Sequence, residues 1–332
     1  MERRGRWFAP VLLVLFFVII NGCMYALFTR RLSNNFGSAA SVKMVDVGSY
    51  LPHEEGSKLV RIDASLTYSA DDAAELPKMD GAAALVPVYA AFIDNLYPKG
   101  TVKYEGGTFS DDNYYGENFA ADSAMQYNNT VRGFTALVDG KTDLFFSVKP
   151  SAEQMKYAQE KGVELVCVPI GREAFVFFVN ADNPVDGLTM QQIRDIYAGK
   201  ITNWKDVGGA NRPINAVTRY PGSGSQTTMD AIMKDTPYGR KSVLAVFGAS
   251  LGYSFRYYLS DMVADSGVKM LSVNGVYPDA GRIRDGSYPI IAEFYAIYRS
   301  DNTNPHIPEI VDWILSDEGQ EIVGKTGYVS VR

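Results

Sequence analysis

From Lys58 to the C-terminus, short apolar runs of strand length alternate with longer stretches whose apolar residues recur at helical spacing. Alternation of this kind predicts an α/β fold, in which helices cover a sheet and ligands bind near the carboxyl ends of strands. The apolar runs predict strands at 58–66, 143–148, 163–170, 173–180 and 288–299. The periodic stretches predict helices at 81–97, 130–140, 151–162, 189–199 and 308–327, and Ser151 and Gln154 have capping-box spacing.

The composition is that of a globular protein with a substantial core. The chain has 332 residues, of which 46% are hydrophobic, and this is enough for one large or two medium domains. The formal net charge of −6 argues against a nucleic-acid-binding protein, because such a protein needs a basic face to displace counterions. An anionic ligand would therefore have to be attracted by a local field.

The N-terminus carries an almost unbroken apolar run over 8–28, with arginines on both sides. Its length suits a membrane span or a secretion signal. Ile20 to Cys23 resembles a bacterial lipoprotein cleavage site, after which Cys23 would be lipidated. An uncleaved signal anchor and a buried helix are the alternatives, because the apolar run continues past Cys23. We expect 1–31 to be a membrane anchor and 32–57 a polar tether, which places the remainder on the extracytoplasmic face.

Several features of the sequence indicate structural roles only. Cys167 is predicted to pack as a small hydrophobe, and Trp204 as a structural residue. The aromatic segment 252–258 is predicted to be a helix that contributes to the core. The two histidines form no zinc-binding pattern with cysteine, and neither a Walker motif nor a dinucleotide fingerprint is present. We therefore predict neither a metal nor a cofactor.

The segment 216–233, AVTRYPGSGSQTTMDAIM, has the pattern of an anion-binding site. An apolar, strand-like run carries Arg219, and a Pro-Gly turn then leads into a helix at Ser223. Because a helix N-terminus presents unpaired N–H groups and a positive dipole end, a tetrahedral oxyanion can bind there. The hydroxyls of Ser223 and Ser225 can cap the helix or donate to a bound oxygen. The alternative is a capped helix after a glycine turn, with no ligand.

Five segments together resemble the phosphate-binding proteins of ABC transporters in their Gram-positive form. The segments are MDGAAALVPVYAAFIDNLYP, VPIGREAFVFFVNADNPVDGLTMQQIRDIYAGKITNWKDVGG, RYPGSGSQTTM, LGYSFRYY and DWILSDEGQEIVGKTGYV. The resemblance implies a two-lobed, type II periplasmic-binding-protein-like fold, whose paired hinge strands let the lobes close over a ligand. With crossings near Asn180 and Tyr288, lobe one would comprise 58–180 and 288–332, and lobe two 181–287.

The resemblance also implies where an oxyanion would bind. Arg219, Ser223, Gly224 and Ser225 match the second-lobe motif of the family. Thr130 falls where the family has a hydroxyl at a helix start in lobe one, although a plain N-cap is equally consistent with its position.

Two positions depart from the family pattern. Alanines follow Asp80 and Gly81 where the family has Ser or Thr, so only the backbone N–H groups of Ala83 and Ala84 could point at the anion. Val148 stands where well-known phosphate binders have an aspartate, which accepts the proton of hydrogen phosphate and excludes sulfate. Without that acceptor, selection among oxyanions is expected to relax.

The implied function is capture of inorganic phosphate, or a related tetrahedral oxyanion, and its delivery to an ABC permease. A membrane-anchored sensor or degenerate paralogue with altered or weak anion binding is the alternative, since Ala83 and Val148 depart from the pattern. An enzyme is disfavoured because a serine nucleophile in GSGSQ would need a nearby base, and the chain has 2 histidines.

Overall fold

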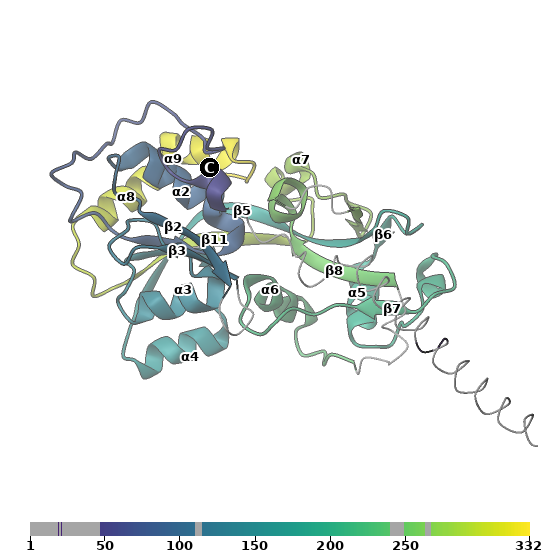
Figure 1. Ribbon diagram of the computed structural model, residues 1–332. Coiled ribbons are helices and arrows are strands. Elements are labelled where there is room, and N and C mark those ends of the chain that lie inside the picture. The colour runs from purple at the N-terminus through teal and green to yellow at the C-terminus, as the bar shows by residue number, and fades with distance from the viewer. Residues whose placement is uncertain (1–18, 20, 22–46, 110–114, 240–248, 263–266) are drawn as a thin grey trace, which may run out of the picture.

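One mixed sheet runs through both halves of the molecule (Figure 1). The computed structural model describes residues 47–109, 115–239, 249–262 and 267–332, together with residues 19 and 21. The strand order is β1-β4-β11-β5-β8-β7, and β9 also pairs with β5. The strands are β1 (Met79–Gly81), β4 (Leu144–Val148), β5 (Leu165–Asn180), β7 (Ile214–Ala216), β8 (Ala249–Phe255), β9 (Val268–Met270) and β11 (Ile291–Arg299).

The strand β5 connects the two halves. Its first part, up to Ala174, pairs with β11, and from Phe175 to Phe178 it pairs with β8. We call the end with β1 and β4 lobe one, and the end with β7 and β8 lobe two. The sequence predicted two strands here because Gly171 and Arg172 interrupt the apolar run. Gly171 is instead inside β5, where the ring of Phe294 leaves no room for a side chain. The predicted two-lobed α/β fold with shared strands is confirmed.

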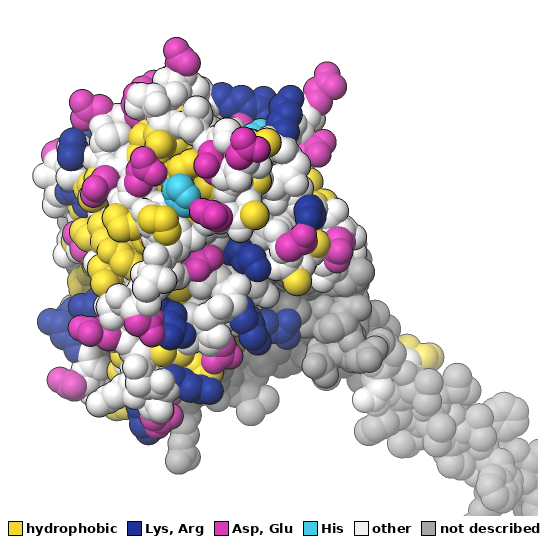
Figure 2. Space-filling model, turned by 90° about the vertical axis from the view of Figure 1, so that its left-hand side faces the viewer, with side chains coloured by type: hydrophobic (Ala, Val, Ile, Leu, Met, Phe, Trp, Pro, Cys, Tyr) yellow, Lys and Arg dark blue, Asp and Glu magenta, His cyan; other side chains and the backbone are white. Residues whose placement is uncertain are grey.

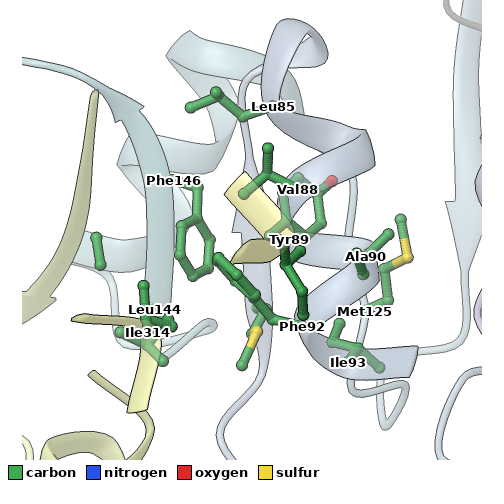
Figure 3. Packing of buried hydrophobic residues seen from close by; sticks show 14 of the residues in the cluster. Leu85, Val88, Tyr89, Ala90, Phe92, Ile93, Met125, Leu144, Phe146 and Ile314 are labelled. Carbon is green, nitrogen blue, oxygen red and sulfur yellow. The ribbon is translucent and has the colours of Figure 1, made fainter. Parts of the chain in front are cut away.

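The helices of lobe one pack against the end of the sheet that contains β1 and β4. Its core includes Tyr89 of α2 (Val86–Leu96), whose ring stacks on Phe146 of β4 at a centroid distance of 5.6 Å (Figure 3). The short 3-10 turn η3 (Ala83–Leu85) precedes α2. The other helices of this lobe are α3 (Asn129–Val138), α4 (Ala152–Glu160), α8 (His306–Leu315) and α9 (Asp317–Lys325).

The single helix predicted at 308–327 is wrong. Ser316 is extended, with ψ 170°, and its side chain accepts a hydrogen bond from the backbone N–H of Gly319. Because an N-cap residue leaves the helical conformation, Ser316 ends α8 and starts α9. The capping box predicted from Ser151 and Gln154 is confirmed at the start of α4.

Lobe two has its own core, in which Trp204 is fully buried. Its helices are α5 (Met190–Tyr197), α6 (Gly224–Met233) and α7 (Ala280–Arg284), and a small sheet pairs β6 (Gly187–Leu188) with β10 (Ser272–Val273). The helix predicted at 252–258 is wrong for 252–255, because β8 extends to Phe255, and only Arg256 to Tyr258 are helical. Residues 250–255 are all buried, so this strand lacks the alternation that distinguishes strands from helices in a sequence.

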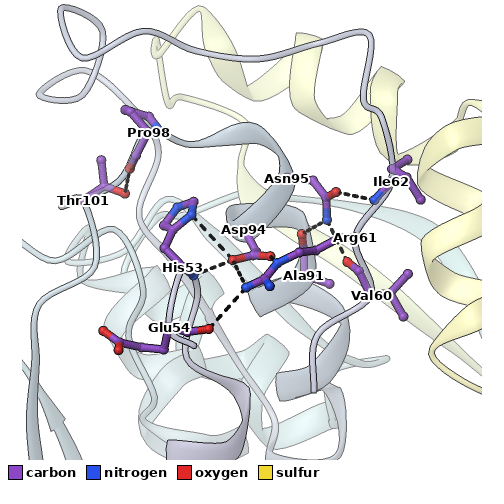
Figure 4. Close-up of polar contacts among 10 residues, drawn as sticks. All are labelled: His53, Glu54, Val60, Arg61, Ile62, Ala91, Asp94, Asn95, Pro98 and Thr101. Atoms are coloured by element: carbon purple, nitrogen blue, oxygen red, sulfur yellow. Dashed lines mark hydrogen bonds and ion pairs between the residues drawn. The ribbon is translucent and has the colours of Figure 1, made fainter. Parts of the chain in front are cut away.

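The segment before β1 packs along α2 without joining a sheet (Figure 4). The strand predicted at 58–66 is therefore wrong. Two of its backbone groups pair with one side chain of α2: Asn95 Oδ1 accepts from the N–H of Ile62 at 2.8 Å, and Asn95 Nδ2 donates to the carbonyl of Val60 at 2.8 Å. Part of the expected tether also packs against this lobe, since Val47 is buried in its core. A hairpin of β2 (Tyr104–Phe109) and β3 (Tyr115–Phe119), not predicted from the sequence, belongs to the same half of the chain.

The expected membrane anchor lies almost entirely outside the described residues. Of the run 8–28, only residues 19 and 21 are described, and Cys23 is not. Among the described helices, none has the length and apolar character that crossing a membrane requires.

Candidate anion-binding site between the lobes

The lobe-two part of the site is the start of α6. Gly222 has a φ of 78°, a left-handed conformation that glycine adopts without strain, and it turns the chain into the helix. Ser223 is the N-cap, and its Oγ accepts a hydrogen bond from Gln226 N at 3.2 Å. Of the two roles open for Ser223, the structure thus shows capping. Ser225 is half-buried in the first turn.

Arg219 lies in the loop between β7 and α6, so the strand-like run that was expected to carry it ends at Ala216. Its backbone N–H donates to Gln226 Oε1 at 2.9 Å and to Tyr253 Oη at 3.1 Å, which fixes the loop. Its side chain is exposed. Burial raises the pKa of Tyr258, and the positive charge of Arg219 opposes this rise. Tyr258 packs against the cores of both lobes.

The lobe-one part of the site is organised by Asp80, which is fully buried at the end of β1. Its Oδ1 accepts from the N–H groups of Gly81 and Asn128 at 2.8 and 2.9 Å, and its Oδ2 accepts from Asn128 Nδ2 at 2.8 Å. Burial raises the pKa of Asp80 to about 6, although these hydrogen bonds oppose the rise. Asp80 therefore joins the turn after β1 to the start of α3. This role of Asp80 was not predicted from the sequence.

Two residues that were predicted to donate to an anion from lobe one, Thr130 and Ala83, both donate to the side chain of Asn129. Its Oδ1 accepts from Thr130 N at 2.7 Å, from Thr130 Oγ1 at 3.3 Å and from Ala83 N at 3.3 Å. Ala84 is held differently, since its carbonyl accepts a hydrogen bond from the hydroxyl of Tyr328 near the C-terminus. One signal in the sequence could have indicated Asn129, namely a pair of asparagines directly before a predicted helix.

The two helix starts face each other across the lobes. A Cβ atom placed on Gly224 would lie 3.2 Å from Val148 Cγ2 and 3.8 Å from Thr130 Oγ1. The turn before it is equally close, because a Cβ on Gly222 would lie 3.3 Å from Val131 Cγ2. The N-termini of α3 and α6 thus meet beside Val148, at the end of β4.

The structure therefore brings Gly224, Thr130 and Val148 together and links Ala83 to them through Asn129. Among the hydrogen bonds and ion pairs of the described residues, none joins the side chain of Arg219 or Ser225 to lobe one. Their place beside Gly224 on lobe two is set by the loop and the first turn of α6.

Figure 2 shows the end of lobe one that faces away from lobe two. Acidic and basic side chains are interspersed there over lobe one. No group of three or more His, Cys, Asp or Glu side chains among the described residues could hold a metal ion. At the site itself, the backbone N–H groups of the helix starts and the positive charge of Arg219 would attract an anion.

A model of the PBP superfamily domain matches residues 111–318. The chain belongs to this superfamily. It is 27% identical over 231 residues to the phosphate-binding protein PstS of Bacillus subtilis, covering 65% of this chain and 73% of that protein. It is 28% identical over 228 residues to PstS of Staphylococcus epidermidis, covering 60% of this chain and 67% of that protein.

Solved structures with this superfamily fold include the putative phosphate ABC transporter substrate-binding protein of Clostridium perfringens, which was solved with bound phosphate. That structure is 25% identical, aligns with a TM-score of 0.55, and the alignment covers 77% of this chain and 99% of the other. A phosphate transport receptor of Vibrio cholerae, 18% identical with a TM-score of 0.50, shares the fold. The resemblance noted in the sequence is thus confirmed at the level of family and fold.

Proposed function

We propose that this chain is an extracytoplasmic solute-binding protein that captures inorganic phosphate between its lobes and delivers it to an ABC permease. The names of its relatives in Bacillus and Staphylococcus, and the phosphate bound in the Clostridium structure, support this ligand. The proposed function involves no chemical conversion of the phosphate.

The observation that carries the proposal is the approach of Gly224 to Thr130. These residues lie at the starts of two helices of 10 residues each, one from each lobe. The N–H groups and the positive dipole ends at the starts of both helices favour an anion at their meeting point. Since the two starts belong to different lobes, an anion bound between them also favours lobe closure.

In this proposal each site residue has a distinct role. Arg219 supplies charge-assisted hydrogen bonds to the phosphate oxygens, and the N–H groups of Gly224 and Ser225 supply neutral ones. Ser223 caps the helix and orients them. From lobe one, Thr130 contributes its hydroxyl and N–H, and Ala83 and Ala84 contribute backbone N–H groups.

Titration calorimetry tests the proposal, with the full-length chain in detergent and phosphate-free buffer. We expect binding of phosphate and arsenate, and a loss of about 10- to 150-fold in phosphate affinity for Arg219→Ala, the effect of one charge-assisted hydrogen bond. Arg212→Ala is the matched control, because Arg212 is also an exposed arginine of lobe two. Equal losses for both variants would contradict a specific role of Arg219.

One alternative function has an observation in its favour. Val148, instead of a carboxylate, packs against the lobe-two core at the meeting point of the lobes. This favours an anchored sensor or degenerate paralogue that binds phosphate weakly or accepts other oxyanions. A folded protein that binds none of phosphate, arsenate, sulfate and methylphosphonate would support the alternative over transport.

Anchoring and permease partnership belong to the same proposal. We propose that the N-terminus holds the protein at the membrane, either through lipidated Cys23 or through an uncleaved helix. Mass spectrometry of the membrane-extracted protein separates the two, because lipidation would make Cys23 the first residue.

A further inference from the structure

The carboxamide oxygen of Asn129 occupies a position that an anion oxygen would be expected to take. It accepts hydrogen bonds from Thr130 N, Thr130 Oγ1 and Ala83 N at 2.7, 3.3 and 3.3 Å. These three donors come from two segments of the chain, since Ala83 is 46 residues from Asn129. They are also three of the four lobe-one donors that the proposed function assigns to phosphate, the fourth being the N–H of Ala84.

The backbone of Asn129 is suited to this arrangement. Its φ of 57° is in the left-handed region, which asparagine tolerates better than other residues with a side chain. In this conformation the short side chain folds back onto the start of α3, and its oxygen reaches the N–H of the next residue. The arrangement satisfies helix-start donors that would otherwise lack a partner within the helix.

We propose that Asn129 is an internal competitor of the anion: its carboxamide oxygen occupies the lobe-one half of the site and must leave before phosphate can bind there. This inference rests on the proposed function. The carboxamide is neutral, so it holds these donors less strongly than a phosphate oxygen would. Asn129 therefore lowers the affinity for every oxyanion, because only the fraction of molecules with the side chain displaced is competent to bind.

Asn129 also stabilises the site when no anion is bound. The donors keep a partner when the anion leaves, so the start of α3 and the turn at Ala83 stay in position. A site of this kind releases its ligand more readily than one whose donors have no internal partner.

Two substitutions of Asn129 with opposite expected effects test the proposal. Asn129→Gly suits the positive φ and removes the oxygen, and we expect it to bind phosphate about tenfold more tightly than the wild type. Asn129→Asp keeps the shape but places a charged acceptor on the same donors. We expect it to bind at least about tenfold more weakly. A merely structural role for Asn129 would not move affinity in both directions.

The chain offers a matched control in Asn274. It also has a positive φ, 51°, and its Oδ1 accepts from a helix-start N–H, that of Met190 at 2.9 Å, at the beginning of α5 in lobe two. Asn274→Gly is expected to leave phosphate affinity unchanged. All variants are measured by calorimetry as full-length chains in detergent, after thermal unfolding has shown that each is folded.

The outcomes separate this inference from the proposed function. Tighter binding by Asn129→Gly alone supports the inference, and so does binding by this variant when the wild type shows none. If the wild type binds phosphate and Asn129→Gly binds equally or more weakly, the inference is overturned and the function stands. If folded wild type and Asn129→Gly both fail to bind phosphate and arsenate, the proposed function is overturned, and the inference with it.

Discussion

Arg256 Nε lies 3.4 Å from Glu173 Oε1, at the point where β5 passes from lobe one to lobe two. Both side chains are largely buried. Arg256 also donates to the carbonyl of Gly327 at 2.6 Å, and Glu173 Oε2 accepts from the N–H of Tyr257 at 3.1 Å. This ion pair therefore joins the crossing strand, the end of β8 and the C-terminal segment.

Removal of Arg256 should destabilise the protein in a pH-dependent way. Burial raises the pKa of Glu173 from its ordinary 4.5 to about 7, and Arg256 opposes this rise. A folded-state pKa above the unfolded value means that ionisation of Glu173 costs stability as pH rises through this interval. Without Arg256 the buried carboxylate lacks its partner, so we expect Arg256→Ala to cost about 3 to 5 kcal/mol at pH 8 and clearly less at pH 6.

Urea unfolding at the two pH values measures this difference. The double variant Arg256→Ala, Glu173→Gln is the control, since it has no carboxylate to ionise at this place. A loss for Arg256→Ala that is the same at pH 6 and pH 8 would show that the charge of Glu173 is not its cause.

Gly224 should be required for closure of the lobes. A Cβ on this residue would lie 3.2 Å from Val148 Cγ2, so a larger side chain would overlap lobe one in the present arrangement. Because separation of the lobes relieves the overlap, Gly224→Val should lower phosphate affinity by about 5- to 150-fold, with a smaller effect on unfolding. Titration calorimetry measures the affinity, small-angle X-ray scattering the separation of the lobes, and urea unfolding the stability. Gly324→Val is the control, because no atom outside its own helix backbone lies within 4 Å of its Cβ position.

Val148→Asp should restore selection for protonated oxyanions. Val148 is half-buried and faces Gly224, so a carboxylate there would be close to the proposed anion. It would accept the proton of hydrogen phosphate and repel sulfate, which has none. We expect the ratio of phosphate to sulfate affinity to rise about 10- to 100-fold. The neutral variant Val148→Asn should change the ratio less, and equal ratios in Val148→Asp and the wild type would refute this role.

Asp80→Asn should remove a loss of stability that accompanies rising pH between about 4 and 6. The folded-state pKa of Asp80 is about 6 and its ordinary value is 3.8, so the folded state keeps the proton longer than the unfolded state. Asp80 therefore contributes less to the stability of the folded state as pH rises through that interval. The carboxamide introduced by Asp80→Asn retains an oxygen for the N–H groups of Gly81 and Asn128. The thermal midpoint at pH 7.5 minus that at pH 4.5 should therefore be more positive in the variant than in the wild type, and an unchanged difference would contradict the assignment.

The sequence alone determined the fold class, because the fold class follows from patterns within short segments. Alternating apolar runs and periodic stretches specify strands and helices locally, and Ser151 with Gln154 specified the start of α4. The same patterns failed in β8, where burial removed the alternation of apolar and polar residues. They also failed at 58–66, where the side chain of Asn95, and not a neighbouring strand, pairs with the backbone of Val60 and Ile62. The serine-glycine turn before α6 was likewise visible, since capping is a local interaction.

Only the tertiary structure decided which of these local features meet. The approach of Gly224 to Val148 and Thr130, the support of the lobe-one turns by Asp80, and the three hydrogen bonds to Asn129 all depend on segments that are far apart in the chain or on different lobes. Periodicity and capping reach only a few residues along the chain. Contacts between the lobes depend on the packing of two cores around one shared strand, and no local pattern encodes that packing.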